Sequence, residues 1–293
     1  MTDQAPGFDE AQLHFFKIFG YVAMRGLLNP DELEMIECKH REGLAAAFSD
    51  EPFKGVSGQW TRMTNEQTLF FASLNEDPRF LTPAQQICGD DVLGNGTDAH
   101  FAVGDTQWHS DSGWQPDSED IQMGVKYHFQ LKSQTAQTGA LCFIPGSHLL
   151  RGSQHRMFGK ALEKTPTEEV PYQGVPLQPG DVIVFDIRTW HASFGGAPDR
   201  RACNAEYFKN PDTDQGVDFL RNIARLEANS HNARKYTYPK NCLGNPHDSP
   251  LRQRWIDHYM EIGFLDQPSV GETISPDFPN RIRRIGDFAF FRR

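Results

Sequence analysis

A turn, an apolar strand and a histidine follow one another in LQPGDVIVFDIRTWH, residues 177–191. The Pro179-Gly180-Asp181 sequence is typical of a tight turn, and residues 182–187 form a mostly apolar run with the length of a buried strand. His191 comes shortly after this run, so its imidazole is predicted at the end of a strand. The segment therefore predicts a sheet that presents a histidine at its edge.

Short apolar runs of the same kind recur on both sides of this segment. The chain holds 25 Gly and 19 Pro among its 293 residues, which favours turns between short strands over a helical bundle. The spacing predicts an antiparallel barrel or jelly roll, a mainly β fold with flanking helices. The other predicted core strands cover residues 99–103, 123–131, 140–144 and 203–208.

Helical periodicity marks the chain on either side of these runs. Apolar residues recur at helical spacing in residues 9–19, behind a capping-type Asp9, and again from Asn29 to about Phe48. The chain between the two predicted helices, residues 21–28, is predicted to be a strand. After residue 208 the sequence turns polar and irregular, until a helix is predicted over residues 251–262.

The sequence contains no repeat and no low-complexity linker, so we expect one domain over residues 1–293. Within it the pattern changes twice along the chain. The three expected parts are a helical N-terminal layer at 1–91, a jelly-roll core at 92–208 and a C-terminal extension at 209–293.

The amino-acid composition limits which classes of molecule the protein is expected to bind. Acidic residues outnumber basic ones by 39 to 29, and this negative field disfavours nucleic acid and anionic membranes, because phosphate binding depends on clustered Lys and Arg. The five cysteines are far apart and are expected to be buried, reduced thiols. The N-terminus lacks the features of a signal peptide, and no apolar run is long enough for a membrane span. We therefore expect a cytoplasmic protein, with a small-molecule substrate left open.

Strict alternation marks residues 125–131, VKYHFQL. Val125, Tyr127, Phe129 and Leu131 share one face of the predicted strand, while Lys126, His128 and Gln130 share the other. The apolar face is expected to pack in the core. The alternation does not decide whether the polar face meets solvent or lines a cavity.

A metal site is suggested by Trp108-His109-Ser110-Asp111. Residues at i and i+2 of an extended segment project to the same side, so His109 and Asp111 could offer a nitrogen and a carboxylate oxygen to one metal ion. His191 at the end of the later strand could complete the set across the barrel mouth. Two histidines and one carboxylate form the facial triad of Fe(II) oxygenases, which leaves three open positions on the metal.

An arginine pair follows the last histidine. Asp199-Arg200-Arg201 enters the strand that ends at Phe208, and a guanidinium there could bind a carboxylate through two parallel hydrogen bonds. Ser193 lies two residues after His191 and could donate its hydroxyl to the same carboxylate. Taken alone, the two arginines could equally be surface residues in a turn.

The order of these motifs resembles the phytanoyl-CoA dioxygenase family of Fe(II)/2-oxoglutarate-dependent oxygenases. The likeness includes His-x-Asp, the run GALCFIPGSH at residues 139–148, Pro-Gly-Asp, Trp190-His191 and the following arginine, and it spans about residues 94–208. The step FKIFGYV at residues 16–22 is also similar to family N-termini.

The resemblance implies a double-stranded β-helix, also called a jelly roll or cupin-like fold. It implies that His109, Asp111 and His191 bind iron, and that Arg200 and Ser193 hold the distal carboxylate of 2-oxoglutarate. Arg201 remains a rival, because the loop before the arginine is shorter than usual in the family. A looser match implies that Lys126 and His128 also face the co-substrate, and His148 is expected to be structural.

The activity implied by the resemblance is hydroxylation of an unactivated C–H bond, with release of succinate and CO2. We expect the substrate to be a small polar metabolite or a natural-product intermediate, with dioxygen as the second substrate. Trp114 is the candidate substrate contact. Two alternatives stay open on the residues alone: a zinc-dependent hydrolase, and a non-catalytic cupin-like metal-binding module.

Overall fold

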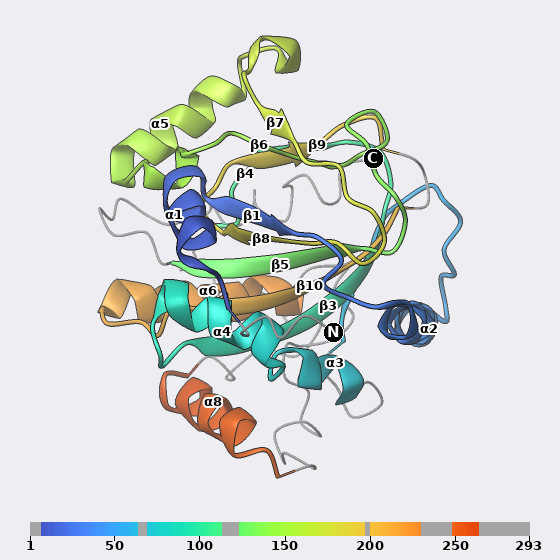
Figure 1. Cartoon of the computed structure of the whole chain (residues 1–293), viewed down its shortest axis with the longest axis vertical. Coiled ribbons are helices and arrows are strands. Elements are labelled where there is room, and N and C mark those ends of the chain that lie inside the picture. Colours follow the sequence, from blue (N-terminus) through green and yellow to red (C-terminus); the bar gives the residue numbers. More distant parts are fainter. Residues whose placement is uncertain (1–6, 64–68, 113–122, 197–199, 230–247, 264–293) are drawn as a thin grey trace.

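Two antiparallel sheets face each other in the computed structural model, which describes residues 7–63, 69–112, 123–196, 200–229 and 248–263 (Figure 1). This arrangement confirms the predicted jelly roll. The large sheet has the order β1 (Tyr21–Met24), β8 (Val182–Asp186), β5 (Gly124–Gln130), β10 (Arg200–Phe208), β3 (Leu93–Ala102) and β2 (Gln59–Arg62). The small sheet has the order β4 (Thr106–His109), β9 (His191–Ser193), β6 (Leu141–Phe143) and β7 (Gln173–Gly174).

Helices cover the outer side of the large sheet, opposite the small sheet (Figure 1). The main apolar core lies between these helices and the sheet, where Tyr127 packs edge-on against Phe80 and donates its hydroxyl to the Phe80 carbonyl at 2.7 Å. The helices on this side are α3 (Leu69–Leu74), α4 (Pro78–Cys88), α6 (Asp214–Asn229) and α8 (Pro250–Glu261). Elsewhere lie α1 (Glu10–Phe19), α2 (Pro30–Ala47), α5 (Gly152–Leu162) and the 3-10 turns η2 (Ser147–Leu149) and η3 (Thr167–Glu169).

The two predicted N-terminal helices are present, and capping residues define where they begin. Asp9 and Asn29 each accept a hydrogen bond from the backbone N–H three residues on, and the side chain at that position bonds back to the cap. Such capping boxes satisfy N–H groups that a helix start leaves without partners. Gly20 ends α1 with a φ of 86°, a conformation that glycine adopts without strain.

Two strand boundaries differ from the prediction. The strand expected over residues 21–28 ends at Met24, because the Arg25 guanidinium and the Gly26 N–H both bind Asp181 in the neighbouring turn, at 2.7 and 2.9 Å. The strand expected over residues 99–103 begins at Leu93. Its early part is rich in Gly and Asn and resembles a turn, but the buried Asn95 and Asp98 find partners across the sheet. Tertiary hydrogen bonds thus override local propensity.

The chain after residue 208 is more ordered than the sequence pattern predicts. Helix α6 occupies residues expected to be irregular, and it buries Phe219 and Leu220 against the core. The helix predicted over residues 251–262 is confirmed as α8, which Ser249 caps.

Four of the five cysteines lie in the described ranges, and all four are free thiols. Cys88, Cys142 and Cys203 are buried as expected, whereas Cys38 is half-buried. Cys242 lies outside the described residues. Among the described helices, none is both long and apolar enough to cross a membrane.

Candidate functional site

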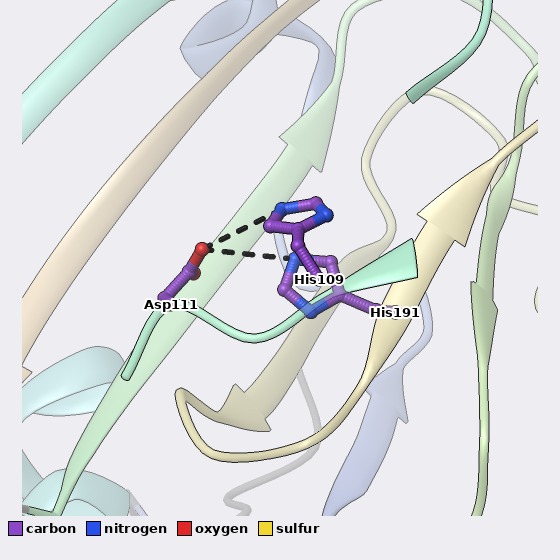
Figure 2. Close-up of side chains that lie close together, drawn as sticks. All are labelled: His109, Asp111 and His191. Carbon is purple, nitrogen blue, oxygen red and sulfur yellow. Dashed lines mark ion pairs between the residues drawn. The ribbon is translucent and has the colours of Figure 1, made fainter. Parts of the chain in front are cut away.

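Two paired strands of the small sheet, β4 and β9, bring His109, Asp111 and His191 together (Figure 2). His109 is the last residue of β4 and pairs in register with His191, the first residue of β9. Asp111 follows β4, and its N–H donates to the Ile187 carbonyl at 2.9 Å. The Asp111 Oδ1 atom lies 3.6 Å from His109 Nε2 and 3.9 Å from His191 Nε2. One potential ligand atom from each residue therefore lies within 4.8 Å of the others, which is close enough for a single metal ion.

Backbone carbonyls orient both imidazoles. His109 Nδ1 lies 2.8 Å from the Gln107 carbonyl, and His191 Nδ1 lies 2.9 Å from the Thr189 carbonyl. A carbonyl only accepts hydrogen bonds, so both Nδ1 atoms carry the proton and both Nε2 lone pairs are directed away from these bonds. Burial, aided by the neighbouring His109, lowers the pKa of His191 to about 3. Two neutral nitrogens and one carboxylate fit a divalent cation such as Fe(II).

A buried arginine lies in the same pocket as these three residues. Arg200 Nη1 donates to Ser193 Oγ at 2.9 Å and to the Gly139 carbonyl at 3.1 Å, and Nη2 donates to the Gly104 carbonyl. Arg200 is only 5% exposed, yet no carboxylate of the described residues forms an ion pair with it, and its Nε has no partner there. Asp105 acts on Arg200 only through its charge, without an ion pair. A buried cation that forms no ion pair within the protein is expected to receive an anion from outside it.

Gly139 makes room for this guanidinium. Its φ is 99°, and a Cβ at this position would lie 2.6 Å from Arg200 Cδ and 2.7 Å from Nη1. Any larger residue would therefore displace the arginine. This observation gives a physical reason for the first glycine of the GALCFIPGSH run.

Arg201 lies on the opposite face of β10. Its guanidinium forms an ion pair with Glu37 of α2, and it does not line the pocket. Because neighbouring residues of a strand point to opposite sides, only one of the two arginines can face the cavity. The structure brings Arg200, not Arg201, next to Ser193.

The polar face of β5 lines the pocket, which answers the question that the alternation left open. Lys126, His128 and Gln130 all face the cavity, while Val125, Tyr127 and Phe129 are fully buried on the other side. Burial, together with His100, lowers the pKa of His128 to about 3, so this imidazole is neutral.

The hydrogen bonds of His128 fix its tautomer. Asn204 donates its amide to Asp98 at 2.8 Å, so its Oδ1 accepts from His128 Nδ1, also at 2.8 Å. His128 Nε2 then accepts from the Gln130 amide at 2.5 Å. His128, Gln130 and Asn204 thus form a continuous neutral wall, which the Asp98 carboxylate anchors through Asn204.

Lys126 also faces the pocket, and its ammonium pairs with two carboxylates of the protein. Its ammonium lies 2.8 Å from Asp111 Oδ2 and 2.7 Å from Glu206 Oε1. Glu206 in turn pairs with Arg62 at 3.0 Å and accepts from the Asn95 amide at 3.0 Å. Two of the three ammonium hydrogens of Lys126 are thus directed at carboxylates of the protein itself.

Sequence reasoning missed Glu206, Arg62, Asp98 and Asn95, all of which are buried. One signal was present: Asn204 and Glu206 alternate with apolar residues along the strand that begins at Arg200. The same pattern in residues 125–131 was recognised as a polar face, but no pattern within one strand identifies the partner on another.

Two other residues predicted from the sequence are His148 and Trp114. His148 belongs to the η2 turn, where its Nε2 lies 3.2 Å from the Lys17 carbonyl, apart from the cluster of His109, Asp111 and His191. This placement agrees with a structural role. Trp114 lies outside the described residues.

A jelly-roll barrel with two histidines and one carboxylate at its mouth is the arrangement of a non-heme iron oxygenase. The chain belongs to the phytanoyl-CoA dioxygenase (PhyH) family, whose family model matches residues 16–202. The protein is accordingly an Fe(II)/2-oxoglutarate-dependent oxygenase. The match begins well before residue 94 and includes the FKIFGYV step of α1 and β1.

Solved structures share this fold. EctD from S. alaskensis with bound Fe is 22% identical, with a TM-score of 0.54, over 71% of this chain and 79% of that one. The non-heme alpha-ketoglutarate-dependent carbocyclase SnoK from nogalamycin biosynthesis is 18% identical, with a TM-score of 0.56, over 70% and 85%. HygX from Streptomyces hygroscopicus with iron bound is 16% identical, with a TM-score of 0.56, over 70% and 88%. No curated protein sequence matches the chain.

Proposed function

We propose that this oxygenase binds Fe(II) through His109, Asp111 and His191, and holds 2-oxoglutarate through Arg200 and Ser193. The single observation that carries the proposal is the buried Arg200 guanidinium, which has no acidic partner among the described residues and shares a pocket with the three metal-binding candidates. A zinc-dependent hydrolase would have no use for a cation held there for a carboxylate.

Arg200 and Ser193 contribute in different ways to the proposed binding of 2-oxoglutarate. Three of the five N–H groups of Arg200 donate to Ser193, Gly139 and Gly104, which fixes the plane of the guanidinium. The Nε–H has no partner among the described residues and is available to one oxygen of a carboxylate. Ser193 Oγ accepts from Arg200, so its own hydroxyl hydrogen is available to the same carboxylate.

We further propose that the reaction is hydroxylation: substrate C–H, dioxygen and 2-oxoglutarate give substrate C–OH, succinate and CO2. Bound iron and 2-oxoglutarate supply the oxidising chemistry. The chain itself binds and orients the reactants, keeps both imidazoles neutral for metal binding and excludes bulk water through the buried pocket walls.

The substrate is proposed to be a small polar metabolite or a natural-product intermediate. The residues that line the pocket support this choice. His128, Gln130 and Asn204 offer neutral hydrogen-bonding groups, while Phe185 and Leu141 supply apolar surface. A compound with uncharged polar groups and an aliphatic skeleton suits this lining.

The test is an anaerobic titration of the metal-free protein with Fe(II) and then 2-oxoglutarate. Chelation by the keto and carboxylate oxygens is expected to produce a weak visible charge-transfer band. The band should form in the natural protein and should be absent in Asp111→Ala. A protein that binds iron but never forms the band would contradict the assignment of 2-oxoglutarate to this pocket.

A screen for substrate follows from the same preparation. Candidate metabolites are added in air, and succinate release is measured against the slow release without substrate. Product mass then reports whether one oxygen atom has been added to the substrate. A product two hydrogens lighter than the substrate, with a new double bond or ring, would show that the reaction is another oxidation and not hydroxylation.

A further inference from the structure

A chain of buried charges ends on one oxygen of Asp111. It runs from Arg62 on β2 to Glu206 on β10, from Glu206 to Lys126 on β5, and from Lys126 to Asp111. The three links measure 3.0, 2.7 and 2.8 Å between the charged atoms. None of the four side chains is more than 14% exposed, so all three links lie inside the barrel.

The two oxygens of Asp111 face different partners. Oδ1 is the atom near both imidazoles, at 3.6 and 3.9 Å from their Nε2 atoms. Oδ2 lies 2.8 Å from the Lys126 ammonium. A carboxylate whose second oxygen is held in an ion pair with a fixed ammonium presents the first oxygen to a metal.

The position of Lys126 is in turn fixed by Glu206 and its partners. It stands directly across from Glu206 in the register of β5 and β10, and Glu206 is fixed by Arg62 and by the Asn95 amide. Glu206 and Asn95 lie on the inner strands β10 and β3 of the large sheet, and Arg62 lies on its edge strand β2. Strands of a sheet are rigid elements on which to hold a side chain. The ammonium therefore has a fixed position from which it orients the Asp111 carboxylate.

We infer that Lys126 is a positioning residue that makes Asp111 bind the metal through Oδ1 alone. This assignment, which rests on the proposed function, has a chemical consequence. On a bound metal, two histidines and one carboxylate oxygen would leave three positions open, and 2-oxoglutarate bound through two oxygens would take two of them. A second oxygen from Asp111 would occupy the last position, which dioxygen needs.

The test replaces Lys126 with methionine, which keeps the length of the side chain and removes its charge. The Mn(II)-loaded protein is saturated with 2-oxoglutarate, and water-proton relaxation reports whether water still reaches the metal. The natural protein should retain the relaxation enhancement that one open position allows, and Lys126→Met should lose it. Glu206→Gln, which loosens the anchor of Lys126, should reduce the enhancement in part, and the exposed Lys160→Met on α5 should leave it unchanged.

Kinetic measurements distinguish a positioning role of Lys126 from a direct contact between Lys126 and 2-oxoglutarate. In air, Lys126→Met should release succinate about 10- to 100-fold more slowly, while the 2-oxoglutarate concentration for half-saturation stays the same. A rise in that concentration as the main effect would make Lys126 a co-substrate ligand and overturn the inference. An unchanged relaxation enhancement would overturn it as well.

Two further outcomes are distinguished in advance. If the single variant fails to fold, the double variant Lys126→Met/Glu206→Gln removes one cation and one anion together and takes its place with the same expectations. If the natural protein does not bind Mn(II), or binds it without responding to 2-oxoglutarate, the proposed function fails. If the natural protein responds and the variants respond identically, only the role of Lys126 fails.

Discussion

The two ends of the barrel interior differ in whether their buried cations form ion pairs with acids of the protein. At the Asp111 end, Lys126 and Arg62 are matched by Asp111 and Glu206, so each cation has an acid of the protein within 3.0 Å. At the other end, Arg200 binds only a hydroxyl and two carbonyls. A buried charge that is paired within the protein therefore serves the protein's own geometry, whereas a buried charge without an ion pair indicates where a ligand of opposite charge belongs.

The largest expected effect is on stability at the compensated end. Arg62→Met would leave Glu206 without its guanidinium partner inside the barrel, and breaking a buried pair from one side costs about 3 to 5 kcal/mol. Urea unfolding of the metal-free protein measures this loss as a lower free energy of unfolding. A loss below about 1 kcal/mol, the size of a surface pair, would mean that water reaches this end of the barrel.

The next effect is on ligand binding at the uncompensated end. Arg200→Met should weaken 2-oxoglutarate binding by about 2 to 5 kcal/mol, because one partner of a buried charge pair is removed. Its free energy of unfolding should fall less than that of Arg62→Met, since no carboxylate of the described residues loses a partner. The charge-transfer titration gives the affinity, and equal affinity in both proteins would remove Arg200 from the site.

A smaller effect concerns the neutral wall between the two ends. His128 has a pKa of about 3 in the folded protein, below its ordinary value of 6.5, so the unfolded chain takes up a proton first as the pH falls. The contribution to stability is complete above pH 6.5 and is lost progressively between about pH 6.5 and pH 3.

Replacing this histidine should therefore flatten the acid side of the stability profile. Between pH 6 and pH 5, metal-free His128→Asn should lose about 1 kcal/mol less free energy of unfolding than the natural protein. Urea unfolding at both pH values gives the comparison. Parallel profiles would show that His128 is protonated in the folded state and that the wall is not neutral.

The sequence predicted the barrel and the cluster of His109, Asp111 and His191 because both leave local signals. Turns and apolar runs mark strands, and residues at i and i+2 of an extended segment share a side. Ser193 beside Arg200 was also expected, since the family motif fixes their order. Features that depend on the local sequence of a single strand could therefore largely be predicted.

The remainder depends on partners far apart in the sequence. Residues 125–131 alternate clearly, but only the pairing of β5 with β10 shows that Lys126 meets Glu206. Likewise, residues 93–98 resemble a turn until Asn95 and Asp98 find hydrogen bonds across the sheet. Helix α6 was missed because polar residues dominate its sequence, although Phe219 and Leu220 are buried. Burial and pairing across strands are properties of the fold, and no local pattern encodes them.

The last and smallest effect is expected from replacing Arg201, which lies next to Arg200 on β10. Arg201 is the immediate neighbour of Arg200, but its guanidinium pairs with Glu37, whose side chain is 38% exposed. A partly exposed ion pair of this kind contributes about 0 to 1 kcal/mol, so Arg201→Ala should change the free energy of unfolding little. It should leave 2-oxoglutarate binding unchanged in the charge-transfer titration. If Arg201→Ala weakened that binding as much as Arg200→Met, strand alternation would not decide which arginine faces the pocket, and the contrast between the two faces of β10 would fail.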